Sequence, residues 1–190
     1  MSDWNQLPPD LPVPVDDGGA DHLTGIRVPS VALPSTGGGL VDLSLMAGSV
    51  VVYAFPRTGV PGESPLSDDW DSIPGARGCT PESCGFRDHH AELRALGTDV
   101  VGLSTQDTAY QQEAVDRLHL PFPLLSDADL ALTQALRLPT MEVAGQRLIR
   151  RLTMLVTDGV VEQVWYPVFP PDTHAEEVLR WLQTHRQPTP

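Results

Sequence analysis

Residues 49–55 read SVVVYAF, a run of apolar side chains that contains three consecutive valines. A strand that is buried on both faces of a sheet carries a continuous apolar run of this kind. We therefore expect residues 49–55 to form a central strand. Helical and extended patterns alternate after it, and Asp127 is placed to cap the third helix. The expected elements are a helix over 80–97, a strand over 98–104, a helix over 107–119, a strand over 122–125 and a helix over 127–138.

The C-terminal part of the chain predicts a hairpin and a last helix. Residues 150–156 and 160–168 are apolar runs on either side of Asp158-Gly159, a strong signal for a two-residue hairpin turn. A capping box that begins at Thr173 precedes a helix with an apolar face. Strands that alternate with helices, followed by a hairpin, predict an α/β fold with a central mixed sheet flanked by helices.

Two segments lack the patterns of regular structure. Residues 1–25 contain four prolines followed by the run DDGG, which predicts a poorly ordered N-terminal arm that is extended or loosely docked. The remaining residues, 26–190, are of a suitable length for one domain. Within it, residues 56–78 are rich in Pro, Gly, Ser and Asp and predict a long loop that leads to Cys79. Such long loops in a compact domain are often functional.

The composition excludes several classes of function. The chain has 190 residues and a formal net charge of −13, which disfavours binding to nucleic acid and to anionic membrane surfaces. It has no long apolar run, and its first residues do not resemble a signal peptide, so we expect a cytoplasmic protein with no membrane span. All 12 basic residues are arginines, and the absence of lysine excludes Schiff-base chemistry through a lysine.

The two cysteines are the strongest candidates for chemistry. Cys79 lies where the long loop meets a predicted helix, and free backbone N–H groups and the helix dipole favour a thiolate there. We expect a depressed pKa at Cys79 but not at Cys84, which is further along the helix. Arg77 and Arg87 add positive charge nearby. The alternative is that both cysteines are small buried hydrophobic residues; their placement favours redox chemistry.

A zinc site is a second interpretation of the same segment, because His89 and His90 follow Cys79 and Cys84 closely. The spacing argues against it. Zinc sites usually pair ligands two to four residues apart around a tight turn, whereas these two cysteines are five apart and partly within a helix. We therefore expect no metal. The other histidines suggest only ordinary solvation; they are His22, His119, His174 and His185.

At this point the sequence resembles a known family. The segments SVVVYAFPRTG, GCTPESCGFRD, DVVGLS, FPLLSD and RRLTMLV before the Asp-Gly turn are similar to those of peroxiredoxins of the bacterioferritin-comigratory, or Q, branch. The resemblance covers roughly residues 26–185. It implies a thioredoxin-like fold and a thiol peroxidase that needs no metal or organic cofactor.

The resemblance also implies roles for individual residues. Cys79 would be the peroxidatic cysteine that attacks hydrogen peroxide or an alkyl hydroperoxide, and Cys84 would resolve it as an intramolecular disulfide. The active-site arginine of the family matches Arg151, which LTMLV follows, while Arg150 would face the other side of the strand. Thioredoxin or a similar dithiol would reduce the disulfide. An intramolecular resolving cysteine needs no second chain, so we expect a monomer.

The chain departs from the family pattern before Cys79. The family has a proline seven residues and a threonine or serine three residues before that cysteine, where this chain has Ser72 and Ala76. An insertion would explain this, with Pro56 and Thr58 taking the places of the family residues and Thr58 supplying the hydroxyl. Alternatively, Pro56 and Thr58 only end a strand.

The missing hydroxyl at Ala76 leaves a second function open: a non-catalytic redox switch in which a Cys79–Cys84 disulfide alters a binding surface near the loop. In either case the helix must open. Residues five apart on an α-helix have Cα atoms about 8–9 Å apart, and a disulfide needs them within about 7 Å.

Overall fold

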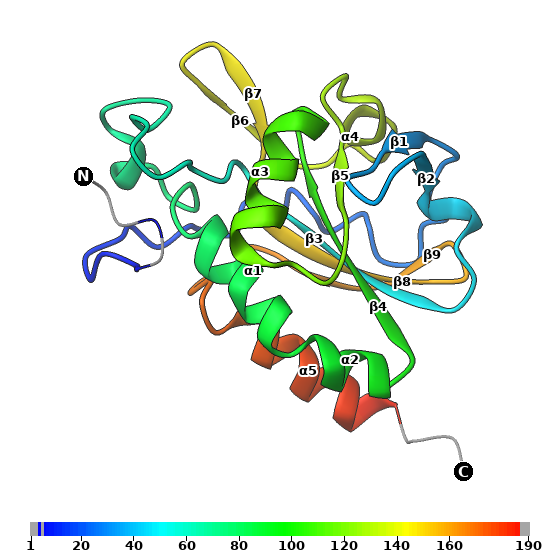
Figure 1. The fold of residues 1–190 in the computed structure, drawn as a ribbon. Helices are drawn as coiled ribbons and strands as arrows, with labels where there is room; N and C mark the ends of the chain where they lie inside the picture. Colours follow the sequence, from blue (N-terminus) through cyan, green and yellow to red (C-terminus); the bar gives the residue numbers. More distant parts are fainter. Residues whose placement is uncertain (1–3, 5, 187–190) are drawn as a thin grey trace.

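The computed structural model describes residue 4 and residues 6–186 (Figure 1). A five-stranded mixed sheet with the strand order β5-β4-β3-β8-β9 forms its centre. Helices cover both faces of the sheet, so the predicted α/β architecture is confirmed. The sheet strands are β3 (Ser49–Ala54), β4 (Thr98–Ser104), β5 (Leu124–Ser126), β8 (Leu152–Thr157) and β9 (Val160–Trp165).

The predicted central strand is confirmed. β3 runs parallel to β4 and antiparallel to β8, and five of its six residues are buried. The hairpin of β8 and β9 turns at Asp158 and Gly159, whose φ angles of 47° and 75° suit the tight turn that the sequence predicts. The parallel part and the antiparallel part of the sheet therefore meet at β3.

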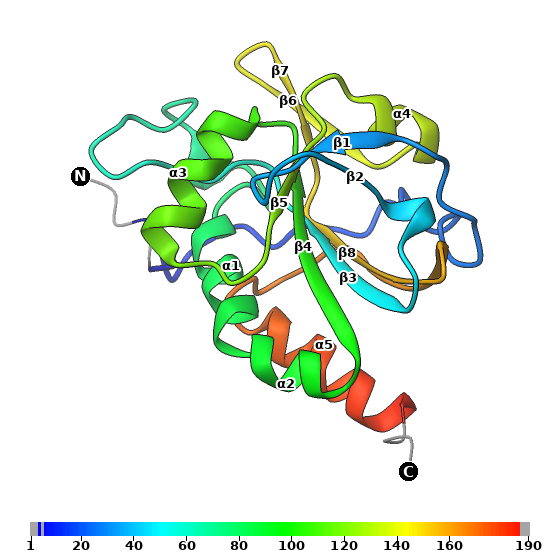
Figure 2. The same ribbon diagram turned by 45° about the vertical axis from the view of Figure 1, so that its right-hand side comes forward.

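The two faces of the sheet are covered by different parts of the chain. On one face, Val51 and Tyr53 of β3 and Phe55, which follows the strand, pack in a cluster with side chains of four helices. These helices are α1 (Cys79–Asp88), α2 (His90–Ala95), α3 (Thr108–Leu118) and α5 (His174–His185). Figure 2 shows α1, α2 and α5 together on one side of β3 and β4.

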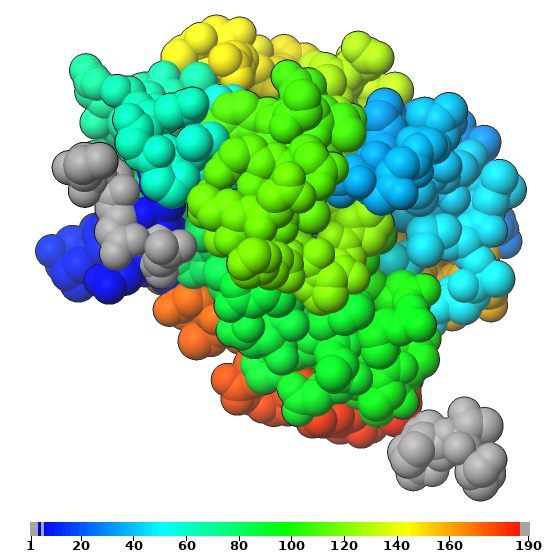
Figure 3. Space-filling view, in the orientation of Figure 1, coloured from blue at the N-terminus to red at the C-terminus, as the bar shows by residue number. Residues whose placement is uncertain are grey.

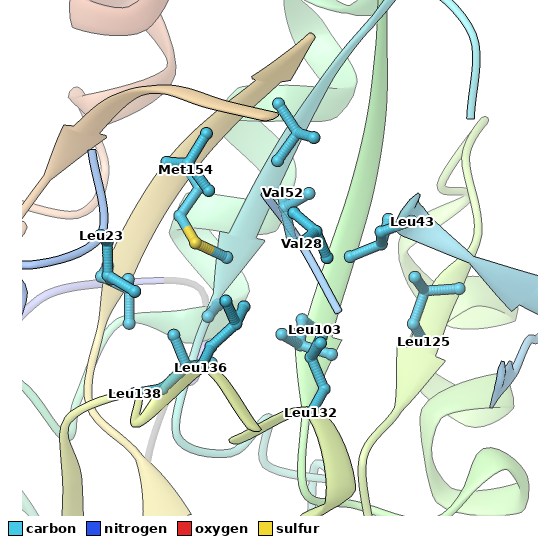
Figure 4. Packing of buried hydrophobic residues seen from close by; sticks show 14 of the residues in the cluster. Leu23, Val28, Leu43, Val52, Leu103, Leu125, Leu132, Leu136, Leu138 and Met154 are labelled. Carbon is cyan, nitrogen blue, oxygen red and sulfur yellow. The ribbon is translucent and has the colours of Figure 1, made fainter. Parts of the chain in front are cut away.

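The opposite face carries the second cluster. Val52 of β3 and Met154 of β8 pack there with leucines of α4 (Ala131–Leu136) and with Leu23 and Val28 from before the first strand (Figure 4). The short strands β1 (Ala32–Pro34) and β2 (Leu40–Asp42) and a 3-10 turn, η1 (Leu43–Leu45), adjoin this cluster.

The N-terminal segment is not a loose arm. Leu23 is fully buried and Ala20 is 4% exposed, because both pack in the core. Trp4 is also buried, in a small cluster with Trp70 of the long loop. At these residues the segment is therefore docked on the domain, in contrast to the loose docking that its composition predicts; residues 1–3 and 5 lie outside the described part of the chain. Trp4, before the prolines, and Ala20 and Leu23, after them, anchor the segment.

The long loop over residues 56–78 is present and contains one 3-10 turn, η2 (Trp70–Ser72). Trp70 is 2% exposed, so the loop is docked on the domain. Figure 3 shows the loop (teal) beside the N-terminal segment (blue) on the same side of the molecule. Within the part of the chain that the structure describes, no helix is long and apolar enough to cross a membrane.

Two helix boundaries and one capping bond differ from the prediction. The helix expected over 80–97 is divided at His89, which has φ −95° and ψ 5°, into α1 and α2. Asp127 does not stand at the N-cap, because α4 starts only at Ala131; its carboxylate still accepts hydrogen bonds from the amides of Leu132 and Thr133. Thr173 precedes α5 but makes no side-chain capping bond.

Two hairpins were not predicted from the sequence, that of β1 with β2 and that of β6 with β7. β6 (Thr140–Val143) and β7 (Gln146–Ile149) pair outside the central sheet, and the turn at Ala144 and Gly145 has positive φ angles. Ala-Gly is not one of the dipeptides that typically mark a two-residue hairpin turn, and an alanine with φ 47° is unusual.

Candidate active site

Cys79 is the first residue of α1, as the sequence predicts for a loop-to-helix junction. The residue before it, Gly78, has φ 108° and is the N-cap of the helix. A Cβ on Gly78 would lie 2.4 Å from a side-chain carbon of Pro171, so only glycine fits there. Cys79 is a free cysteine and 3% exposed. The thiol of Cys79 is thus buried at the start of a helix, and Pro171 packs against the residue before it.

Arg151 is the side chain that meets the sulfur. Its Nη2 donates to Sγ of Cys79 over 3.2 Å and to the carbonyl oxygen of Arg77 over 3.0 Å. Arg151 is 2% exposed, whereas Arg150 is half-buried and donates from Nε to the carbonyl oxygen of Thr140. The two adjacent arginines therefore point to different places, and only Arg151 reaches the cysteine.

Glu82 forms an ion pair with Arg151 beside Cys79. The sequence did not single this residue out. Its Oε2 accepts from Nη1 of Arg151, and its side chain is fully buried. Burial raises the pKa of Glu82, and Arg151 opposes this rise. The other oxygen, Oε1, has no hydrogen-bond partner among the described residues. The only signal in the sequence was an acidic residue in the first turn of a helix.

The electrostatic balance at Cys79 differs from the expectation. Burial raises the pKa of Cys79, and this desolvation outweighs Arg151 and the backbone amide of Arg57, which both lower it. Glu82 raises the pKa further. The predicted depressed pKa is therefore wrong for this closed state, because a helix start and one arginine do not compensate for the loss of water around the sulfur. Sγ of Cys79 instead donates to the carbonyl oxygen of Ala76 over 3.6 Å.

Pro56 and Thr58 flank Arg57, whose backbone amide forms a hydrogen bond with the sulfur of Cys79. Both residues therefore lie next to a segment that contacts the sulfur. Both are buried. The hydroxyl of Thr58, however, donates to Oε1 of Gln106 over 3.2 Å, and the structure shows no hydrogen bond from it to the sulfur. Ala76, which has no hydroxyl, takes part in the site only through its carbonyl oxygen.

Cys84 lies in the second turn of the same helix and is also free. It is half-buried, and burial raises its pKa while Arg87 opposes the rise. The helix is continuous from Cys79 to Asp88. The two thiols therefore occupy the helical arrangement whose geometry prevents a disulfide.

The histidines of this segment make other contacts. His89 pairs with Glu92 over 2.6 Å, and the ring of His90 lies 5.6 Å from that of Phe122. Among the described residues, no group of three or more His, Cys, Asp or Glu side chains could hold a metal ion. His174 corrects a minor expectation: it is 1% exposed, and its Nε2 lies 2.9 Å from the hydroxyl of Thr153.

Comparisons with known proteins show which family and which fold the chain resembles. A family model described as Redoxin matches residues 23–179. Peroxiredoxin Bcp of Escherichia coli K12 is 30% identical over an alignment of 171 residues, which covers 85% of this chain and 96% of that protein. Peroxiredoxin Q, chloroplastic, of Oryza sativa subsp. japonica is 30% identical over 161 residues, 84% of this chain, and the chain spans 66% of that protein's length. The crystal structure of Peroxidoxin BcpB from Mycobacterium tuberculosis matches with a TM-score of 0.69 and 29% identity, covering 87% of this chain and 100% of that one.

Proposed function

Because the chain belongs to the peroxiredoxins of the Redoxin family, whose members are thiol peroxidases, we propose that it reduces hydrogen peroxide and alkyl hydroperoxides through Cys79. The observation that carries the proposal is the contact of 3.2 Å between Nη2 of Arg151 and Sγ of Cys79 at the first residue of α1. This arrangement aims a permanent positive charge at the atom that would act as nucleophile.

In the first step, the sulfur of Cys79 attacks the terminal oxygen of the hydroperoxide and the O–O bond breaks. Cys79 becomes a sulfenic acid, and the proton of the thiol leaves with the other oxygen as water or alcohol. Arg151 and the backbone amides at the helix start stabilise the negative charge that develops on sulfur and oxygen. The raised pKa of Cys79 means that this proton must be moved during the reaction.

In the second step, the thiol of Cys84 condenses with the sulfenic acid, which forms the Cys79–Cys84 disulfide and releases water. An external dithiol then reduces this disulfide by exchange and is itself oxidised. Thioredoxin is the reductant in this proposal, and the cytoplasm, where thiols are kept reduced, is the compartment. Both cysteines belong to one chain, so the cycle requires neither a metal, an organic cofactor nor a second subunit.

A redox switch without turnover is the second candidate. The hydroxyl of Thr58 is bonded to Gln106 and Ala76 has none, so no side-chain hydroxyl of the described residues is bonded to the sulfur. Burial also favours the protonated thiol. Both features would slow the reaction with peroxide. Slow oxidation to the disulfide could then alter the surface formed by the loop over 56–78.

Steady-state consumption of hydrogen peroxide and of cumene hydroperoxide by the protein with a thioredoxin system separates the two. We expect many turnovers per protein molecule, loss of activity in Cys79→Ser, and sulfenic acid that persists in Cys84→Ser. Oxidation that stops after one equivalent of peroxide, with thioredoxin and its reductase in excess, would contradict the enzyme and favour the switch.

A further inference from the structure

The first turn of α1 must open before Cys84 can reach Cys79, and the structure shows what holds this turn closed. Helical geometry keeps the Cα atoms of the two cysteines about 8–9 Å apart, which is beyond the reach of a disulfide. The amide of Glu82 donates to the carbonyl oxygen of Gly78 over 3.1 Å, so this bond closes the first turn. Any group that fixes Arg77 and Gly78 therefore opposes the opening.

Arg77 is fixed by the N-terminal segment. Its guanidinium carbon lies 4.4 Å from the centroid of the Trp4 ring, and its Nη2 donates to the carbonyl oxygen of Gln6 over 3.5 Å. The arginine also pairs with Asp71 of the long loop over 3.5 Å. Although charged, Arg77 is only 5% exposed. Cation–π contacts are stronger when the cation is desolvated in this way.

Gly78 is covered by the same segment. A Cβ placed on Gly78 would lie 3.0 Å from Cδ2 of Leu7, so Leu7 packs directly over the N-cap of α1. Trp4 also packs against Gly59, because a Cβ on Gly59 would lie 2.5 Å from two ring carbons of the indole. Trp4 is therefore held between Gly59 and Arg77 and is 8% exposed. We call Trp4, Gln6 and Leu7 the N-terminal clamp; the N-terminal segment lies beside the loop in Figure 3.

We propose that the N-terminal clamp controls the resolving step: it holds the first turn of α1 closed and slows the condensation of Cys84 with the sulfenic acid of Cys79. Trp4 and Arg77 are positioning residues, since their side chains act on the helix start and make no contact with the sulfur of Cys79. This inference rests on the proposed peroxidase, because it assigns a rate to one step of that cycle. The clamp therefore lowers the turnover rate and lengthens the lifetime of the sulfenic acid.

A longer-lived sulfenic acid is more exposed to a reaction that competes with the condensation with Cys84. A second hydroperoxide can transfer an oxygen atom to the sulfur of Cys79, which converts the sulfenic acid to a sulfinic acid and releases water or alcohol. Condensation with Cys84 removes the same intermediate and protects the sulfur. The clamp therefore sets the peroxide concentration at which the protein inactivates itself, and weakening the clamp is expected to raise that concentration.

The experiment compares Trp4→Ala with wild type in single-turnover mixing with hydrogen peroxide, followed by acid quenching and mass spectrometry. We expect an unchanged rate of sulfenic acid formation and a disulfide formation rate about tenfold higher, as loss of one desolvated cation–π contact allows. Trp4→Phe keeps a ring over Arg77 and is expected to restore most of the slow rate. Trp181→Ala, which removes an indole on α5 that stacks on His185 at 4.2 Å, is the matched control and is expected to leave both rates unchanged.

A second measurement stands independently of peroxide chemistry. In the reduced protein, the amide of Glu82 is expected to exchange its hydrogen faster in Trp4→Ala than in wild type, while the amide of His89, which bonds to Gly85 at the other end of α1, keeps its protection. Unchanged exchange at Glu82, or a disulfide rate that does not rise, would overturn the clamp. A wild-type protein that forms no sulfenic acid would refute the proposed function alone, and the exchange measurement would still decide on the clamp.

Discussion

The two halves of α1 are held in different ways, although they belong to one helix of ten residues. In the first turn, Cys79 and Glu82 are buried against the guanidinium of Arg151. In the second half, Phe86 is fully buried and stacks on Tyr53 of β3 with ring centroids 4.6 Å apart. The first turn is thus fixed by polar and charged contacts, and the second half by packing in the core.

This difference suits a helix that must open at one end only. Charged contacts that desolvate their partners contribute little net stability, since the loss of water offsets most of the attraction. Aromatic packing in the core has no such offset. We infer that the second half of α1 anchors the helix to the sheet while the first turn can open and carry Cys79 toward Cys84.

The largest expected effect is on the free energy of unfolding and concerns Phe86, which anchors the second half of α1 to the sheet. Phe86→Ala removes a fully buried ring and is expected to lower the free energy of unfolding by about 3–5 kcal/mol. Urea denaturation of the reduced protein measures it. Phe86→Leu, which keeps most of the apolar volume, serves as the control and is expected to cost clearly less. A loss below about 1 kcal/mol for the alanine variant would show that the second half is not the anchor.

The next effect concerns the charge at the first turn. Arg151→Ala is expected to slow the reaction of Cys79 with peroxide by an amount equivalent to about 2–4 kcal/mol, the range for one donor aimed at developing charge. Arg150→Ala, at the neighbouring position, is expected to have little effect because its guanidinium bonds to Thr140 instead. Stopped-flow oxidation measures both rates. Equal losses in the two variants would contradict the role of Arg151.

The first turn also makes a prediction about pH. Arg151 lowers the pKa of Cys79 and Glu82 raises it. In a Cys84→Ser background, thiolate absorbance should therefore titrate at lower pH in Glu82→Gln and at higher pH in Arg151→Gln. Since the thiolate is the stronger nucleophile, the rate with peroxide rises with pH in each protein, and the rise shifts in the same directions as the pKa.

Shifts of the same sign in both variants would mean that the carboxylate acts on the sulfur only by holding Arg151 in place. In that case the loss of either partner would remove the same positive charge from the sulfur. The titration of Cys79 thus separates a direct electrostatic effect of Glu82 from an indirect one.

Oxidation should distinguish the two halves directly. We expect the disulfide form to lose hydrogen-exchange protection at the amide of Glu82, which closes the first turn, and to retain it at the amide of His89. Pro81 makes the opening easier because it donates no backbone hydrogen bond. Unchanged protection at Glu82, with the disulfide confirmed by mass, would mean that the bond forms without the opening that helical geometry requires.

The regular part of the fold could be predicted from the sequence because its signals are local. The apolar run of β3, the helical pattern of α3 and the Asp-Gly turn each act through neighbouring residues, and the structure has all three. The position of Cys79 at a helix start was predictable for the same reason. Arg151 required the resemblance to a family, because the strand pattern alone gives no reason to prefer it to Arg150.

The surroundings of the sulfur could not be predicted in this way. The burial of Glu82 depends on Arg151, which is 69 residues away in the sequence. The desolvation of Cys79 depends on the cover of its helix start, to which Leu7 and Pro171 contribute. Trp4 and Leu7 precede a proline-rich stretch whose composition suggested a loose arm, and a single apolar side chain gives no periodic signal. Contacts between distant parts of the chain therefore determine the chemistry that local patterns predicted incorrectly.

The smallest expected effect concerns Thr58, and it decides between two interpretations of the insertion. If Thr58 replaced the family hydroxyl in contact with peroxide, Thr58→Val would slow the reaction strongly. In the structure this hydroxyl donates to Gln106, whose side-chain amide donates back to the carbonyl oxygen of Thr58 over 3.3 Å. Loss of such a bond costs about 0.5–1.5 kcal/mol of stability, so we expect a slightly less stable protein with a peroxide rate close to that of wild type. A reduction of the rate as large as that of Arg151→Ala would show that the hydroxyl of Thr58 turns toward the substrate during the reaction. The loop before α1 would then supply one of the groups that act at Cys79.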